Sequence, residues 1–308
     1  MVGLGVDEAE AALAKGRDVL WHARAGRPRP RLDDKVLTAW NGLMIAAFAR
    51  ASRVLARPEY LEAAQRAAAF IRTNLWEPGA RRLLRRYRDG EAAIEAFADD
   101  YACLVFGLLE LFQADGNPEW LAWALALQEA QDARFWDPSG GGWFSTTGSD
   151  PSVLVRSKED YDGAEPSPTA VSAWNLVILA HVTGDMAKLE QAERAFRQAS
   201  SLTSQASRAV PMLMAALSAH EASICQVVIV GPPTRADTRR LLGALGSRFL
   251  PFAVCIPVDP DHRENLSSLV PGVGAMSLVD GRATAYVCTD FTCQAPTTDA
   301  ETILAQLK

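Results

Sequence analysis

The stretch "TAWNGLMIAA", residues 38–47, recurs in nearly the same form as "SAWNLVILA", residues 172–180. Each stretch is apolar on every side of a helix and carries an asparagine, Asn41 or Asn175, among its large apolar side chains. A helix that is apolar all round is normally buried. The repeated stretch therefore predicts two buried helices in one chain.

A more polar helix follows the first of these stretches. At Pro58-Glu59, and again at Pro118-Glu119, a proline and an acid open a helix that has one apolar stripe and one charged face. Both residue types suit the free N–H groups and the positive end of the helix dipole. The chain therefore alternates inner and outer helices with a period of roughly 60 to 70 residues. A third unit has residues 168–183 inside and 185–203 outside.

The pattern changes near residue 223. The segments "ICQVVIVG", "TRADTRRLLGAL" and "FAVCIPV" are a buried strand, an amphipathic helix and a second buried strand, which together predict a βαβ unit. A later apolar strand, "ATAYVC", extends this to a small α/β subdomain with a mostly parallel sheet. We predict a helical domain over residues 1–222 and an α/β subdomain over residues 223–308.

Composition narrows the classes of function. The net charge of −6 offers nucleic acid no basic surface. The first residues, "MVGLGVDEAEAALAKG", lack the pattern of a signal peptide, and no stretch reaches the roughly 18 apolar residues of a membrane span. We expect a soluble, cytoplasmic protein. The five cysteines are scattered through apolar segments and are expected to be reduced thiols. The turn "GPPTRAD" has no phosphate-binding glycine motif, so we expect no cofactor.

Several motifs in order resemble one family. "RPRPRLDDKVLTAWNGLMIA", "AFADDYACL", "KEDYDGAEPS" and "ATAYVCTDFTCQAPTTD" are similar to the C-terminal half of the spermatogenesis-associated thioredoxin-domain proteins. The resemblance implies a six-hairpin (α/α) toroid, as in glycoside hydrolases and N-acylglucosamine 2-epimerases. It also implies an N-terminal thioredoxin-like domain as partner in a longer protein. With fewer helices than a closed ring needs, we predict an incomplete toroid, a fragment, followed by the α/β subdomain.

The resemblance places a site at one end of the ring, where polar residues open the inner helices. Glycoside hydrolysis needs two carboxylates, one acting as acid and the other as base or nucleophile. The candidates for catalysis, from different inner helices, are Asp34, Asp100 and Glu165. Spacing along the chain does not decide between retaining and inverting chemistry.

Two turn-rich segments lead to the inner helices and are predicted to form β-hairpins over the mouth of the ring. They contain Asp89-Gly90 and Asp162-Gly163, and alternating residues such as Val153 and Val155 fit short strands. Aromatic faces among charged groups suit a sugar ligand. The candidates for substrate binding are Lys35, Trp40, Asn41, Arg86, Tyr87, Tyr101, Trp143, Lys158, Asp162 and Asn175.

Structural roles compete with these assignments. An Asp or Ser at a helix start caps free N–H groups, although only one member of Asp33-Asp34 or Asp99-Asp100 can be the N-cap. Trp40 and Trp174 lie among apolar residues, which favours a place in the core over a role as a sugar platform. A buried asparagine, as at Asn41, needs a hydrogen-bond partner, which a neighbouring inner helix can supply. Of the four histidines, His181, His220 and His262 lie away from the proposed mouth, which disfavours an epimerase that uses a histidine pair.

A redox role is the alternative from another class. Cys288 and Cys293 flank "TDFT" after a strand, and they are too far apart for a disulfide in an extended strand unless "TDFT" turns. No histidine lies close enough in sequence to complete a zinc site, so no metal is predicted. We predict a carbohydrate-related toroid that binds or hydrolyses a sugar, with catalysis left open. The alternatives are a non-catalytic scaffold and a thiol-redox partner.

Overall fold

The computed structural model describes residues 5–149, 151–222, 224–289 and 292–307. The chain divides into two compact units, Met1–Lys35 and Val36–Lys308.

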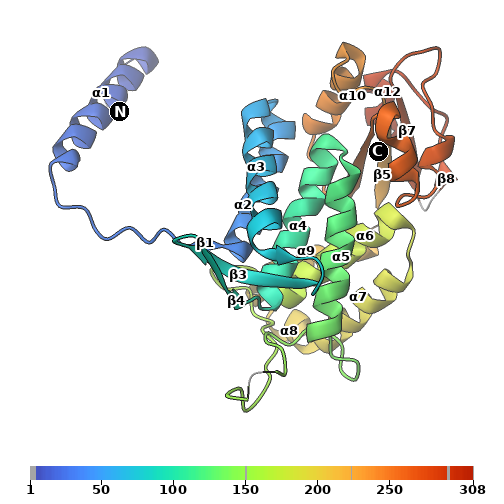
Figure 1. Ribbon diagram of the computed structural model, residues 1–308. Coiled ribbons are helices and arrows are strands. Elements are labelled where there is room, and N and C mark those ends of the chain that lie inside the picture. Colours follow the sequence, from blue (N-terminus) through green and yellow to red (C-terminus); the bar gives the residue numbers. More distant parts are fainter. Residues whose placement is uncertain (1–4, 150, 223, 290–291, 308) are drawn as a thin grey trace. The chain divides into compact units, whose positions relative to one another are not determined.

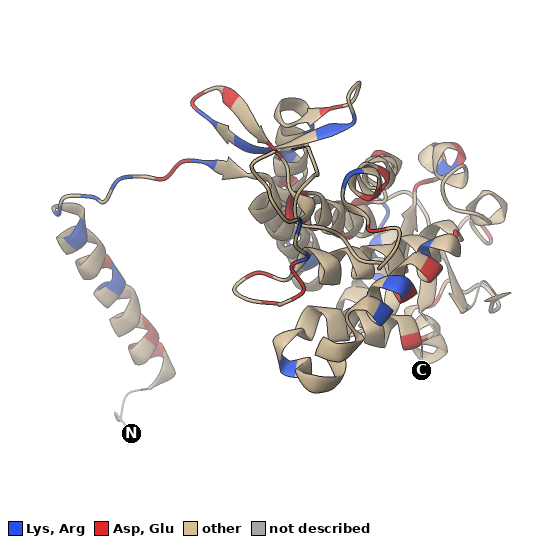
Figure 2. Ribbon diagram, turned by 90° about the horizontal axis from the view of Figure 1, so that it is seen from below, with Lys and Arg blue, Asp and Glu red and all other residues tan. Residues whose placement is uncertain are grey.

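The smaller unit consists of helix α1 (Val6–Ala25) and the segment that follows it (Figure 1). At the start of α1, the Glu8 carboxylate accepts a hydrogen bond from the Gly5 N–H at 3.2 Å. Figure 2 shows acidic residues near the N-terminal end of α1 and basic residues further along, an order that suits the helix dipole. Between these charges α1 exposes apolar side chains, Leu13 and Leu20 among them.

The larger unit begins with paired helices. Its helices up to residue 221 are α2 (Thr38–Leu55), α3 (Pro58–Asn74), α4 (Ala98–Asp115), α5 (Pro118–Phe135), α6 (Pro168–Thr183), α7 (Ala187–Gln198), α8 (Ser200–Gln205), the 3₁₀ turn Ser207–Ala209 and α9 (Pro211–Glu221). Helices α2, α4, α6 and α9 contact one another in this order, and α3, α5 and α7 each pack on the inner helix that precedes them (Figure 1). The predicted alternation of inner and outer helices is confirmed.

The inner helices α2 and α4 approach so closely that their backbones touch. A methyl group on Gly42 would lie 2.4 Å from the carbonyl oxygen of Cys103. A methyl group on Gly107 would lie 2.5 Å from the carbonyl oxygen of Gly42. Glycine is therefore required at both positions of this crossing.

A small antiparallel sheet lies beside the starts of the inner helices. Its strands are β1 (Val36–Leu37), β2 (Trp76–Glu77), β3 (Arg82–Arg88) and β4 (Glu91–Glu95). Strand β3 pairs with each of the other three. The predicted hairpin at Asp89-Gly90 is confirmed, because β3 and β4 meet at this turn and both turn residues have positive φ.

The second predicted hairpin, before α6, is wrong. Described residues 136–167 form no strand beyond a single bridge between Trp136 and Trp143. Hydrogen bonds from side chains fix this segment, in place of the expected β-ladder. Arg156 donates to the carbonyl oxygens of Thr146 and Arg134, and Lys158 donates to the carbonyl oxygen of Gly141.

A second sheet, in the α/β part, has the order β6-β5-β7-β8. The elements of this part are β5 (Cys225–Val230), α10 (Ala236–Gly246), β6 (Ala253–Val258), the 3₁₀ turn Pro260–His262, α11 (Arg263–Ser267), the 3₁₀ turn Val273–Ala275, β7 (Thr284–Thr289), β8 (Thr292–Cys293) and α12 (Ala300–Gln306). The predicted βαβ unit is confirmed, since β5 and β6 are parallel. The prediction of a mostly parallel sheet is wrong, because β7 runs antiparallel to both β5 and β8. Only the short α11 and 3₁₀ turns are described between β6 and β7, and such a connection lacks the long helix of a parallel crossover.

The sheet is buried on both faces. Val228 and Val230 of β5 join the main helical core, whereas Val227 and Ile229 pack in a second cluster with Leu241 of α10. The open edge of β6 is covered by α4, where the Gln113 side chain accepts the N–H of Cys255 at 3.2 Å. The structure is therefore a layer of (α/α) hairpins joined to an α/β part, as predicted.

The predicted division at residues 222 and 223 stays a prediction, and residue 223 lies outside the described residues. In the part of the chain that the structure describes, no helix combines the length and the apolar character needed to cross a bilayer.

Candidate functional site

The starts of the inner helices are tied together by hydrogen bonds. The N–H of Ala39, in the first turn of α2, donates to Asp100 of α4 at 3.1 Å. The indole N–H of Trp40 donates to Glu165, just before α6, at 2.7 Å. Residues from three separate repeats therefore meet at this end of the helical layer.

Asp100 is the centre of this network and is fully buried. Its carboxylate accepts the N–H groups of Ala39 and Phe97 and an Arg85 guanidinium N–H at 2.6 Å. Burial and the neighbouring carboxylate of Asp99 raise the pKa of Asp100 to about 7, against the opposing charge of Arg85. A carboxylate so enclosed and so well bonded suits a positioning role better than contact with a ligand.

Asp99 is the more accessible member of the carboxylate pair, with a side chain 23 % exposed. Both of its oxygens lie 3.1 Å from the same Arg85 nitrogen. The Arg85 guanidinium also lies 4.8 Å from the centre of the Phe97 ring. One arginine thus holds both adjacent carboxylates and an aromatic ring.

Trp40 and Phe97 expose large apolar surfaces at this end, 56 % and 39 % of each residue, so the expected core position is wrong for Trp40. The Trp40 ring is fixed in orientation by its bond to Glu165, which is itself exposed. We call Trp40, Phe97, Glu165, Asp99 and Arg85 the mouth face. It presents two aromatic rings among two carboxylates and a cation.

The two asparagines of the repeated stretch differ in role. Asn175 donates to the carbonyl oxygen of Ala102 at 2.9 Å and so ties α6 to α4 as expected. Its buried Oδ1 has no partner among the described residues. Asn41 donates to the carbonyl oxygen of Leu37, one turn earlier in its own chain segment. Neither of these two hydrogen bonds involves a residue of the mouth face.

Some predicted binding residues lie in packed surroundings. Trp143 is fully buried and donates to Asp132. Tyr101 is fully buried, and its hydroxyl accepts the N–H of Leu83. Lys158 donates to Asp137 at 2.7 Å, and this bond is the main reason why the pKa of Asp137 is lowered. These contacts give Trp143, Tyr101 and Lys158 structural roles. Their roles in substrate binding stay predictions.

Other predicted residues lie nearer the surface. Tyr87 packs edge-on against Phe70, with ring centres 5.1 Å apart. Arg86 lies 3.8 Å from Glu91 within the β3–β4 hairpin. Asp162 accepts backbone N–H groups of Ser167 and Met212, which joins the start of α6 to α9.

Asp34 and Lys35 belong to the smaller unit. There, the Lys35 ammonium lies 3.2 Å from Asp33. Their proposed roles in catalysis and binding stay predictions.

Arg85 and Phe97 are not among the residues predicted for the site. Residues alternate across β3, so selecting Arg86 for the mouth excluded its neighbour Arg85. A signal was present nonetheless, because a buried carboxylate needs a cation or several N–H donors. Arg85 is half-buried and close in sequence to Asp100.

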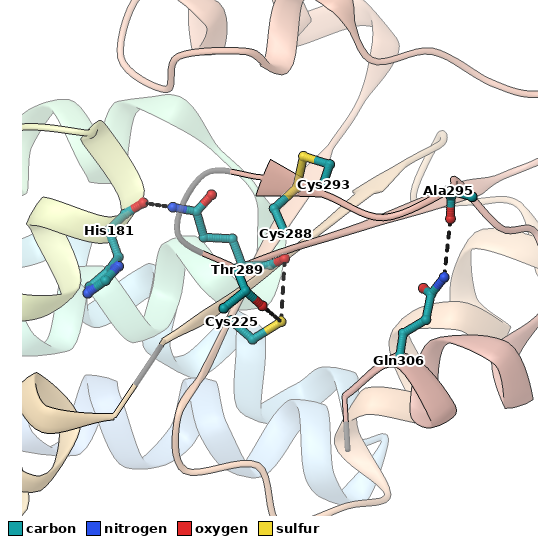
Figure 3. The surroundings of a disulfide bond; sticks show 8 residues. His181, Cys225, Cys288, Thr289, Cys293, Ala295 and Gln306 are labelled. Carbon is teal, nitrogen blue, oxygen red and sulfur yellow. Dashed lines mark hydrogen bonds between the residues drawn. A yellow bond between two sulfur atoms is a disulfide. The ribbon is translucent and has the colours of Figure 1, made fainter.

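The cysteines at the end of the chain form a disulfide, contrary to the expectation of reduced thiols. Cys288 of β7 lies opposite Cys293 of β8, and their sulfur atoms are bonded (Figure 3). The antiparallel pairing brings together two side chains that one extended strand would keep apart. Cys288 is buried and Cys293 exposed. Cys103, Cys225 and Cys255 are free thiols, as expected.

A metal site is not apparent in the described ranges, where no cluster of three His, Cys, Asp or Glu side chains is arranged to hold an ion.

Curated proteins with similar sequences support the predicted family resemblance. Spermatogenesis-associated protein 20 of Rattus norvegicus is 37 % identical over 308 residues, which cover 96 % of this chain and 39 % of that protein. The Homo sapiens protein of the same name is 36 % identical over 306 residues, with the same coverage. This chain thus matches a C-terminal part of these relatives and spans well under half of their length. No family model matches it.

Two solved structures are similar to part of this chain. A sugar epimerase from a ruminal bacterium has a TM-score of 0.46 and 16 % identity, covering 55 % of this chain and 44 % of that one. A family 76 glycoside hydrolase, a mannosidase, from Bacteroides thetaiotaomicron has a TM-score of 0.44 and 13 % identity, covering 71 % of this chain and 56 % of that one.

Proposed function

We propose that this chain, related over 96 % of its length to a C-terminal part of spermatogenesis-associated protein 20, binds a saccharide at the mouth face. The observation that carries the proposal is the environment of Trp40. Its ring is 56 % exposed, yet its indole N–H is held by Glu165 at 2.7 Å. An exposed aromatic ring fixed by a carboxylate is ready to bind a ligand that has both an apolar face and hydroxyl groups.

The chemistry of the mouth face suits a sugar. The C–H face of a sugar ring stacks on an aromatic ring, and its hydroxyls donate to carboxylates such as Glu165 and Asp99. Arg85 can donate to a sugar oxygen, since its side chain is 27 % exposed. Asp100 accepts the backbone N–H groups of Phe97 and of Ala39, the residue directly before Trp40. It therefore positions the two aromatic residues of the mouth face without touching the ligand.

Hydrolysis is a narrower proposal than binding. The two-carboxylate mechanism requires both groups to reach the glycosidic bond, and Asp100 is fully buried. Glu165 and Asp99 are the accessible carboxylates of the mouth face. Any hydrolysis at this site would therefore use Glu165 with Asp99, in place of Glu165 with Asp100.

A saccharide that binds the mouth face raises the Tm of the chain by mass action. We expect Trp40→Ala and Glu165→Gln to weaken its binding by about tenfold or more, which corresponds to about 1.4 kcal/mol. The measurement is a thermal-shift screen with mannose, N-acetylglucosamine and cellobiose, followed by calorimetric titration. Phe249→Ala, a change of another exposed aromatic residue outside the mouth face, is the control and should leave the affinity unchanged.

A folded chain that shows no saccharide-dependent shift would contradict this proposal and favour the scaffold role. Equal binding by the wild type and Trp40→Ala would place the saccharide elsewhere.

The disulfide favours thiol exchange as a second candidate function. Cys293 is exposed, so a thiolate of a dithiol protein can attack its sulfur and form a mixed disulfide. Cys288 leaves as a thiolate and takes up a proton. The second thiol of the partner then releases Cys293 and closes the partner's own disulfide, so that two electrons have passed to this chain. The thioredoxin-like domain expected from the family resemblance is a partner of this chemical class.

Cys225 is excluded from this exchange by its position. It lies opposite Thr289 in the sheet, whereas Gln226 lies opposite Cys288, so Cys225 and Cys288 point to opposite faces. Its sulfur accepts a hydrogen bond from the Thr289 hydroxyl, as Figure 3 shows. Burial also raises the pKa of the Cys225 thiol, which lowers its reactivity.

Thiol counting tests the redox proposal. Under denaturing conditions the untreated chain should show three free thiols, and the reduced chain should show all five. Cys293→Ser should show four free thiols both before and after reduction, whereas Cys225→Ser should show two before and four after. Five free thiols in chain purified aerobically without reductant would rule out the disulfide. If a dithiol protein does not reduce the disulfide in the folded chain, thiol exchange is contradicted and the disulfide has a structural role.

A further inference from the structure

A cavity of about 690 Å³ lies away from the mouth face, beside the C-terminal half of α2. Its walls come from α2, α4 and α6 on one side and from β6, α10 and the segment between them on the other. The volume is in the range of small-molecule sites. None of the mouth-face residues is among its described lining.

Most of the cavity wall is apolar. Its apolar side chains include Val54, Leu61, Ile178, Ile224, Leu242 and Phe252. The thiol of Cys255 is part of the same wall, and burial raises its pKa to about 11, so it stays neutral. Such a wall favours a hydrocarbon chain or ring over water.

The charges around the cavity are mainly positive, although the whole chain has a net charge of −6. Arg50, Arg53, Arg239 and Arg248 line it together with Glu110. Glu110 is buried and is neutralised by Arg50 and Arg53, the latter at 2.5 Å. The described lining therefore retains excess positive charge next to an apolar wall.

Arg53 also has an unused donor. Its Nε is buried and has no hydrogen-bond partner among the described residues. A buried donor without a partner is costly, and an anionic group bound beside Arg53 would accept its N–H. A carboxylate matches the planar guanidinium, since both present two atoms side by side.

We propose that this cavity binds an amphiphilic carboxylate, an apolar chain or ring that carries one carboxylate group. The apolar part occupies the wall formed by α6, α10 and β6, and the carboxylate lies beside Arg53. A neutral apolar molecule would leave the Arg53 donor unpaired, and a small hydrophilic anion would leave the apolar wall in water. This inference is independent of saccharide binding at the mouth face.

Gly243 offers a way to fill the cavity without disturbing the fold. It lines the cavity from α10, and a Cβ placed on it would meet no atom within 4 Å. Gly243→Leu should therefore block the ligand while keeping the Tm. The matched control is Gly79→Leu, since Gly79 is also unobstructed and lies outside the cavity lining.

The test is calorimetric titration of the whole chain with decanoate below its micelle-forming concentration, in parallel with decanol and acetate. We expect saturable decanoate binding, with decanol and acetate at least about tenfold weaker. Arg53→Gln should weaken decanoate by about tenfold or more, whereas Arg53→Lys should weaken it less, because lysine keeps the charge. Gly243→Leu should abolish binding, and Gly79→Leu should not.

Equal affinity for decanol and decanoate would overturn the role of the arginines. Unchanged decanoate binding by a folded Gly243→Leu would overturn the assignment of the cavity, as would the absence of binding by the wild type.

Discussion

Gly42→Ala lowers the free energy of unfolding by about 3 kcal/mol, the upper part of the usual range for overpacking. The new methyl group would lie 2.4 Å from the carbonyl oxygen of Cys103 and 2.6 Å from the N–H nitrogen of Leu104. Both atoms belong to the backbone of α4, so no side-chain rotation relieves the clash. The helices α2 and α4 must separate, which opens the contact between the first two inner helices.

Urea unfolding of the wild type and Gly42→Ala measures this effect. Gly243→Ala is the matched control, because Gly243 is also helical but has no atom within 4 Å of the added methyl group. Its stability should be unchanged or higher by up to about 1 kcal/mol, since alanine favours a helix over glycine. Equal stability of Gly42→Ala and the wild type would contradict the close crossing of α2 and α4.

Asp100→Ala is the second change with a large expected effect, a loss of about 3 to 5 kcal/mol in the free energy of unfolding. The substitution removes the acceptor of two backbone N–H groups and one of the two carboxylates that neutralise Arg85. The N–H of Ala39 then remains without that acceptor in a buried place, and the N–H of Phe97 in a partly buried one. Asp99→Ala is the control and should cost about 1 kcal/mol or less, because its side chain is 23 % exposed and its bonding partner among the described residues is Arg85.

The pH dependence of the free energy of unfolding distinguishes the effect of the Asp100 charge from the effect of its side-chain shape. Its pKa is about 7 in the folded chain, above the value of about 3.9 for an unfolded aspartate. The folded state therefore binds this proton more tightly than the unfolded state does. Protonation of Asp100 thus contributes to the free energy of unfolding, fully below a pH of about 4, and the contribution is lost as the pH rises through about 7. Urea unfolding at pH 5 and pH 8 should show a steeper decline for the wild type than for Asp100→Asn. Parallel declines would contradict the raised pKa.

Local patterns in the sequence are sufficient to predict the alternating inner and outer helices from α2 to α7 and their order. The all-apolar stretch around Asn41 and the proline-acid openings, such as Pro58-Glu59, are visible without knowledge of any distant contact. The Asp89-Gly90 turn was also predictable, because its residue types tolerate the positive φ that the turn requires.

Features that depend on distant partners were not predictable in the same way. Alternation at Val153 and Val155 suggested a strand, but Arg156 and Lys158 anchor that segment to backbone carbonyl groups instead. The direction of β7 depends on how the chain returns to β5, which periodicity does not encode. The same pairing brings Cys293 opposite Cys288 and so determines the disulfide.

The candidate site shows the same division. Trp40 and Glu165 could be named from their places at helix starts, but their mutual hydrogen bond joins residues 125 positions apart. Asp100 could be named as a carboxylate at a helix start, whereas its burial depends on α2, Arg85 and the turn before α4. Packing between the repeats therefore determines that Asp100 is buried and Glu165 is exposed to solvent.

Nitrogen-15 NMR of the tryptophan indole groups tests the proposed function most directly. The chain has eight tryptophans, and the spectrum of Trp40→Phe identifies the Trp40 signal by its loss. Titration with mannose, N-acetylglucosamine or cellobiose should shift the Trp40 indole signal saturably, because the ligand stacks on this ring next to its bond with Glu165. If all three saccharides leave the Trp40 signal in place, or shift only that of Trp174 in the cavity wall, the mouth face is not the saccharide site.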